Sequence, residues 1–66
     1  MKVYAILNNY QMSSYAHNVL KSHIVEETRL DPKHTKVVWD DMSISDVRLL
    51  GKALGGEGRV KEVGND

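Results

Sequence analysis

The chain has 66 residues and no cysteine, and its nine acidic side chains balance its nine basic ones. This length holds one domain, and the zero net charge argues against nucleic acid as a partner, because phosphate binding needs a basic excess. No apolar run approaches the roughly 20 residues that cross a bilayer. We therefore expect a single domain over residues 1–66, with no membrane contact.

The first apolar run, Val3–Leu7, carries apolar side chains on both alternating faces. This pattern predicts an interior strand, because a run buried on both faces is typical of a strand with neighbours on both sides. The run is shorter than the about 7–15 apolar residues of a secretory leader. We therefore expect a cytoplasmic protein.

A polar turn over residues 8–14 leads into a predicted helix over residues 14–30, with a serine as its N-cap. Apolar residues recur in this segment at helical spacing. They are Ala16, Val19, Leu20, Ile24 and Leu30. Asp31–Pro32 is predicted to end the helix, because the residue before a proline is pushed out of the α region.

A second helix is predicted over Ile44–Leu54. Ser43 and Asp46 have the spacing of a capping box, with Ser43 as the N-cap. Gly55 follows the last apolar position, where a left-handed residue commonly closes a helix. The buried stripe of this helix is expected to comprise Ile44, Val47, Leu50, Gly51 and Leu54.

Two further strands are predicted over Lys36–Asp40 and Arg59–Val63, and residues 63–66 are expected to fray. The fold class is thus α/β, a three-stranded strand-helix-strand-helix-strand unit with Val3–Leu7 central. If the strands run parallel, right-handed crossovers place the helices on opposite faces. If the third strand is antiparallel, both helices can cover one face, and the other face needs a partner.

Polar side chains follow both of the first two predicted strands. In a parallel sheet, ligands bind beyond the carboxyl ends of the strands, and helix N-termini at that edge attract anions. The candidate ligand-binding residues are Asn8, Asn9, Tyr10, Ser14, Asp40, Asp41 and Ser43. Asp40 and Asp41 offer carboxylates to a Mg²⁺ ion bridging to a phosphate. Alternatively, all are ordinary turn and cap residues, and we expect no metal site and no cofactor.

The small size of the chain points to association. A domain of about 60 residues buries only about 60% of its unfolded surface, and no disulfide supports this one. Tyr10, Val25 and Leu49 are apolar or aromatic residues outside the predicted buried stripes, so they are candidates for a partner-binding surface. We expect a homo-oligomer or a complex with a larger protein.

No nucleophile-base set or metal constellation can be assembled from the sequence, so we do not expect an enzyme. The preferred function is a small binding or inhibitory module that acts by protein–protein association. Accessory proteins of phages and mobile elements are a class of this size, although no motif here identifies one. The alternative is a binder of a small phosphorylated ligand or nucleotide at the carboxyl edge of the sheet.

Overall fold

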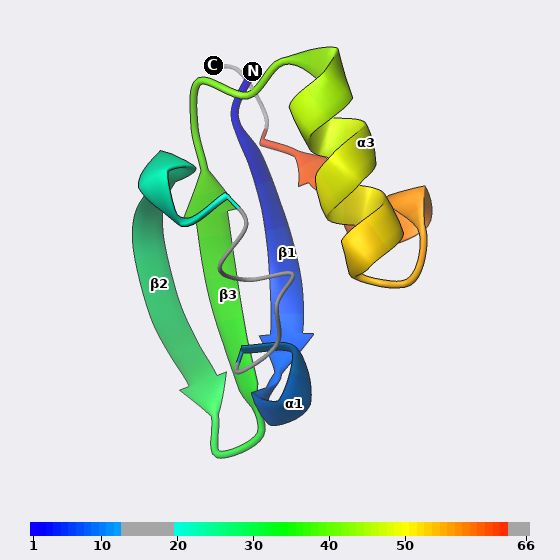
Figure 1. The fold of residues 1–66 in the computed structure, drawn as a ribbon. Coiled ribbons are helices and arrows are strands. Elements are labelled where there is room, and N and C mark those ends of the chain that lie inside the picture. Colours follow the sequence, from blue (N-terminus) through cyan, green and yellow to red (C-terminus); the bar gives the residue numbers. More distant parts are fainter. Residues whose placement is uncertain (13–19, 64–66) are drawn as a thin grey trace.

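The computed structural model describes residues 1–12 and 20–63, which form a four-stranded sheet in the order β2-β3-β1-β4 (Figure 1). Every strand pairing among these residues is antiparallel. The strands are β1 (Val3–Asn8), β2 (Ile24–Asp31), β3 (His34–Trp39) and β4 (Lys61–Glu62). The helices are α1 (Asn9–Met12) and α3 (Ile44–Ala53), with 3-10 turns η1 (Lys21–His23) and η2 (Glu57–Arg59).

Strand β1 lies inside the sheet, as its apolar run predicts. The expected burial of both faces is wrong, because Ile6 is 51% exposed. Strand β1 pairs with β3 along its whole length, from Val3 opposite Trp39 to Asn8 opposite His34, and with β4 on its other side. The α/β class is also confirmed. The predicted three-stranded unit is not matched, because a fourth strand forms and all neighbouring strands among the described residues pair antiparallel.

The predicted helix over residues 14–30 is wrong from Leu20 onward, while residues 14–19 lie outside the described residues. The chain forms η1 and then β2, which turns back into β3. Aspartate and proline at the first and second positions favour a tight turn, and the Asp31 Oδ1 atom accepts a 2.7 Å hydrogen bond from the Lys33 N–H. Pro32 therefore joins two strands and does not end a helix.

Helix α3 matches its predicted bounds to within one residue. Ser43 Oγ accepts from the Asp46 N–H at 3.1 Å, and Asp46 Oδ2 accepts from the Ser43 N–H at 3.0 Å, so the capping box is confirmed. Gly55, with a φ of +101°, closes the helix in the left-handed region as predicted. The prediction that Ile44 belongs to the buried stripe is wrong, since this residue is exposed.

Both helices pack on one face of the sheet, and the main cluster of buried hydrophobic side chains lies on that face. Leu50 and Leu54 join the alternate β1 residues Val3, Ala5 and Leu7 in one cluster, and Met12 at the end of α1 packs against it. Trp39 is fully buried in this cluster. The other face of the sheet has no helix over it among the described residues. None of their helices is long and apolar enough to cross a membrane.

Candidate functional site

The structure does not bring the predicted polar residues together at one edge. Asn8 lies opposite His34, at the end of β1, whereas Asp40 follows Trp39, which lies opposite Val3 at the other end. The carboxyl ends of antiparallel neighbours point in opposite directions. The prediction of a single ligand-binding edge, which assumed a parallel sheet, is therefore wrong. Ser14 lies outside the described residues.

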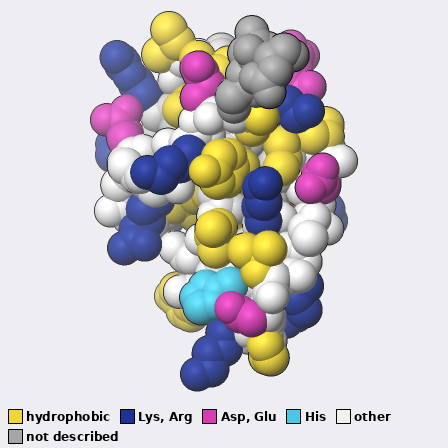
Figure 2. Space-filling view, turned by 180° about the vertical axis from the view of Figure 1, so that it is seen from behind, with side chains coloured by type: hydrophobic (Ala, Val, Ile, Leu, Met, Phe, Trp, Pro, Cys, Tyr) yellow, Lys and Arg dark blue, Asp and Glu magenta, His cyan; other side chains and the backbone are white. Residues whose placement is uncertain are grey.

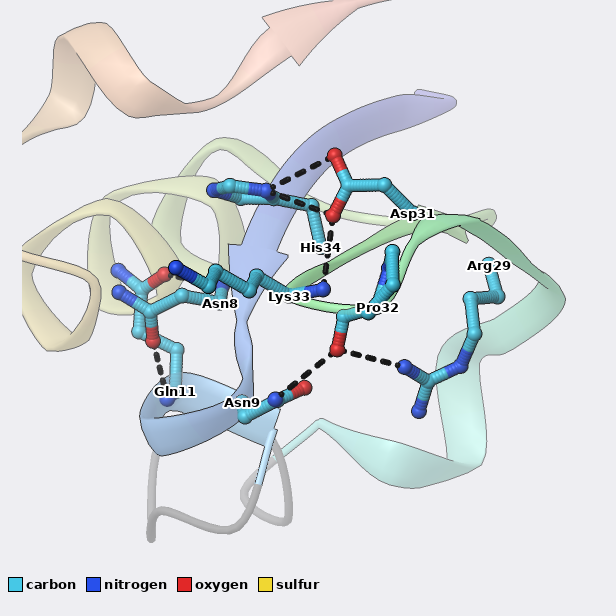
Figure 3. Close-up of polar contacts among 8 residues, drawn as sticks. All are labelled: Asn8, Asn9, Gln11, Arg29, Asp31, Pro32, Lys33 and His34. Carbon is cyan, nitrogen blue, oxygen red and sulfur yellow. Dashed lines mark hydrogen bonds and ion pairs between the residues drawn. The ribbon is translucent and has the colours of Figure 1, made fainter.

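Asn8 and Asn9 stabilise the fold where α1 meets the β2–β3 hairpin (Figure 3). The Asn8 side chain accepts from the Gln11 N–H at 2.8 Å, and the Gln11 side chain accepts from the Asn8 N–H at 2.9 Å. This reciprocal pair caps α1 in the manner of a capping box. Asn9 Nδ2 donates to the Pro32 carbonyl at 3.2 Å, which holds the hairpin against α1.

At the opposite end of the sheet, the two aspartates shape the turn between β3 and α3. Asp40 Oδ1 accepts from the Asp41 N–H at 2.8 Å, and Asp41 has a φ of +59°. Aspartate tolerates this left-handed conformation better than most residues. Together with Ser43 as the N-cap of α3, these contacts assign turn and cap roles to all three residues. Residues 1–12 and 20–63 contain no group of three or more His, Asp or Glu side chains arranged to hold a metal ion.

The three predicted partner-binding residues are exposed but lie on three different elements. Tyr10, on α1, is 82% exposed, Val25, on β2, is 57% exposed, and Leu49, on α3, is 47% exposed. Tyr10 follows the Asn8 end of the sheet, whereas Val25 lies near the Trp39 end. The structure therefore does not bring these residues into one surface.

A more continuous apolar surface lies on the sheet face opposite the helices. Because side chains alternate along a strand, Tyr4 and Ile6 point away from the core. Their partners on this face are Val38, which is buried, and Lys36, which is half-buried. Figure 2 shows hydrophobic side chains along the middle of this face, with basic and acidic side chains around them. Ile6 is 51% exposed, and Lys36 Nζ lies 5.0 Å from the centroid of the Tyr4 ring, a cation–π distance.

A groove opens beside this surface because β4 is very short. β4 pairs only with Val3 and Tyr4, and beyond it the chain lies in η2. The resulting hollow, which we call the β1–η2 groove, is lined by Tyr4, Ala5, Ile6, Gly58, Arg59 and Lys61. Past Tyr4, no strand of the described residues pairs with this edge of β1.

The backbone N–H and C=O groups of Ile6 are directed toward this open edge of β1. The Lys2 carbonyl accepts from the Val63 N–H at 2.9 Å, so Lys2 presents its polar groups on the β4 side. Successive residues of a strand point to opposite sides, which places the N–H and C=O of Tyr4, Ile6 and Asn8 on that side as well. Tyr4 pairs with Lys61, and the Asn8 N–H donates to Gln11. Ile6 is thus the position at which a further strand can pair.

The side chains of the groove set its electrostatic preference. Arg59 and Lys61 bring two positive charges, and no acidic side chain is among the lining residues. An apolar floor with cations beside it suits an extended segment that carries apolar and acidic side chains.

Comparison of the chain with protein family models, curated proteins and solved structures finds no match.

Sequence reasoning missed Ile6, Arg59 and Lys61 because it looked for polar residues at strand ends. A usable signal was present in the run Gly55–Gly58, which allows a turn that shortens the following strand. The alternative with both helices on one face also implied that Tyr4 and Ile6 would lack a helix over them. Choosing between the two arrangements required the strand directions.

Proposed function

We propose that this protein is a small binding module that acts by protein–protein association, and that it takes an extended, acidic segment of its partner into the β1–η2 groove. The observation that carries the proposal is the early end of β4. It leaves the Ile6 backbone at the sheet edge, between an apolar face and the cations Arg59 and Lys61. We include a cytoplasmic location and an accessory or inhibitory role in this proposal.

Binding would occur by strand addition. In this mode, main-chain hydrogen bonds supply affinity, and alternate side chains of the added segment supply specificity. Ile6 offers one backbone donor and one acceptor to the added segment. One set of its side chains would then lie beside Tyr4 and Ile6, where an apolar residue fits, while acidic residues would face Arg59 and Lys61.

Selection from a displayed library of random peptides on the immobilised protein tests this proposal. We expect selected peptides to combine acidic with β-branched or aromatic residues. Their affinity should fall by roughly tenfold or more, or about 1.4 kcal/mol, in the Ile6→Asp variant and in an Arg59→Glu, Lys61→Glu double variant. Leu49→Asp is the control, because Leu49 lies on α3 and should leave binding unchanged. Peptides without acidic enrichment, or equal binding to all variants, would contradict the proposal.

A phosphorylated small ligand is a second candidate, although at a different place from the predicted edge. Arg48 and Lys52 lie one turn apart on α3 and line a hollow with Gly56 and Glu57. Two cations are suited to a phosphate group, whereas the Glu57 carboxylate opposes it. Nucleotides that bind here should raise the melting temperature, and Arg48→Ala together with Lys52→Ala should abolish that rise. No shift with any nucleotide would exclude this candidate.

A further inference from the structure

The outer edge of β2 is the longest strand edge that has no further strand beside it among the described residues. β2 ends the sheet on the side away from β4, and seven of its eight residues are exposed. Edge strands of this kind pair readily with a second chain unless something blocks them. Two irregularities in the β2–β3 pairing, at Ile24/Glu26 and at Arg29/Asp31, leave a regular stretch between them.

The backbone groups that face outward belong to Glu27 and Arg29. The His23 carbonyl accepts from the Asp40 N–H at 2.9 Å, so Asp40 and the alternate β3 residues Val38 and Lys36 direct their polar groups toward β2. Their partners, Glu26 and Thr28, therefore direct theirs toward β3. The residues between and after these partners, Glu27 and Arg29, present their N–H and C=O groups on the outer side.

We infer that two copies of this chain pair through β2 as antiparallel strands, with Thr28 opposite Thr28 on a two-fold axis normal to the sheet. This axis keeps opposed side chains on the same face, so a residue can oppose itself or a residue an even number of places away. With Thr28 on the axis, Glu27 of each copy lies opposite Arg29 of the other. The outward backbone groups of the same two residues then form the hydrogen-bonded pairs.

The charges of Glu27 and Arg29 favour this register over the two registers with the axis one residue away. Moving the axis to Glu27 would place two glutamates directly opposite each other, and moving it to Arg29 would place two arginines opposite each other. Like charges at opposed positions destabilise a strand pair, and opposite charges stabilise it. The selected register also places Glu26 opposite Leu30 of the second copy, so no further like charges oppose each other along this stretch.

The proposed ion pairs are compatible with contacts inside each copy. Arg29 Nη1 donates to the Pro32 carbonyl at 3.0 Å, which uses one of the five N–H donors of a guanidinium. A carboxylate accepts up to about four hydrogen bonds, so the pairing does not require Glu27 to lack a partner in its own copy.

The dimer would continue one sheet across both copies, with all helices on one side. This arrangement places a β1–η2 groove at each far edge of the joined sheet. One dimer would then offer two grooves to a bivalent partner, a step that rests on the proposed function. Linked binding events raise apparent affinity when the geometry allows both to form at once. The dimer itself does not depend on the grooves.

Charge exchange between variants tests the inference by sedimentation equilibrium. We expect the parent chain to dimerise, and Glu27→Lys and Arg29→Glu each to weaken dimerisation by roughly tenfold or more, because each removes two attractive pairs and adds two repulsive ones. An equimolar mixture of the two variants should dimerise again, because Lys at 27 then faces Glu at 29, and Arg at 29 faces Glu at 27. Glu26→Lys carries the same change in charge as Glu27→Lys but has no charged residue opposite it, so it should leave the dimer intact.

Circular dichroism melting of each variant would show that the monomer is folded, and the mixture tests the register even if one variant is less stable alone. A parent chain that stays monomeric at high micromolar concentration would overturn the inference, as would a Glu27→Lys dimer or a mixture that fails to associate. A dimer lost in Ile6→Asp but kept in Glu27→Lys would place the interface on the uncovered face. The peptide test of the groove is independent, since Ile6→Asp should stay dimeric.

Discussion

A Cβ atom built on Gly51 would lie 2.8 Å from the Cα of Glu57, closer than such atoms approach in proteins. Gly51 is buried on α3, and Glu57 begins η2, so the missing side chain lets η2 lie directly against the helix. The Gly56 N–H completes this junction by donating to the Gly51 carbonyl at 2.7 Å. Because η2 carries Arg59, this close approach also sets one wall of the β1–η2 groove.

We predict that Gly51→Ala destabilises the protein. Alanine gains about 1 kcal/mol of helix propensity over glycine, but overpacking against backbone costs about 1–3 kcal/mol, and the contacted Cα atom belongs to backbone that cannot simply rotate away. Chemical denaturation would measure the net loss. Gly58→Ala is the control, since a Cβ there meets nothing within 4 Å, and it should be neutral or stabilising. A Gly51→Ala variant as stable as the parent would show that η2 moves freely from α3.

Helix α3 and strand β1 were predictable because their signals are local. The Ser43–Asp46 spacing fixed the start of the helix, Gly55 fixed its end, and the apolar run Val3–Leu7 indicated a strand with neighbours on both sides. Each of these features depends on residues a few positions apart. No knowledge of the remaining chain was needed to interpret them.

Strand β2 was not predicted because the apolar residues in and before it also fit helical spacing. Leu20, Ile24 and Leu30 recur as on a helix, yet Leu30 is half exposed, and the β-branched residues Val25 and Thr28 favour a strand. Pro32 is compatible with a helix end and with a hairpin turn alike. Since β2 is the hairpin partner of β3, missing it also reversed the direction of β3 relative to β1, and the predicted site failed for that reason.

Substitutions at Asp41 test whether the backbone of the turn after β3 is strained. Its φ of +59° costs most residues about 1–2 kcal/mol, whereas glycine adopts it without penalty. Asp41→Gly should therefore be neutral or slightly stabilising, and Asp41→Val should lower the free energy of unfolding by roughly 1–2 kcal/mol. Thermal melting of both variants would check this. Equal stability of the valine variant and the parent would mean that the turn adopts another conformation in solution.

Ser43→Ala should destabilise the protein by about 1 kcal/mol, the usual effect of losing an N-cap side chain. The variant leaves the Asp46 N–H without the acceptor that Ser43 Oγ provides at 3.1 Å. Ser45→Ala is a matched control in the same helical turn, where Ser45 is exposed, and its effect should stay within about 0.5 kcal/mol. Equal effects of both substitutions in urea denaturation would show that the cap contributes nothing.

The carboxylates of Asp46 and Asp31 make the stability of the fold depend on pH in the acid range. The pKa of Asp46 lies below its ordinary value of 3.8, chiefly because the Ser43 N–H donates to the charged carboxylate. The pKa of Asp31 is lowered from the same value, chiefly by the hydrogen bond from the Lys33 N–H and further by His34, whose Nδ1 lies 3.0 Å from Asp31 Oδ1. The charged forms are thus favoured in the folded state at both positions.

We therefore predict that the melting temperature falls as the pH is lowered through and below 3.8. A group whose folded pKa lies below its unfolded pKa stabilises the fold above the unfolded value, and this contribution disappears as pH falls through the folded value. Asp46→Asn keeps an oxygen that accepts from the Ser43 N–H but does not titrate. The variant should have a lower melting temperature than the parent at neutral pH. Its melting temperature should also fall less than that of the parent when the pH is lowered from 7 to below 3.8. Melting curves measured across this range would decide, and parallel pH profiles for parent and variant would show that the Asp46 carboxylate does not contribute to acid sensitivity.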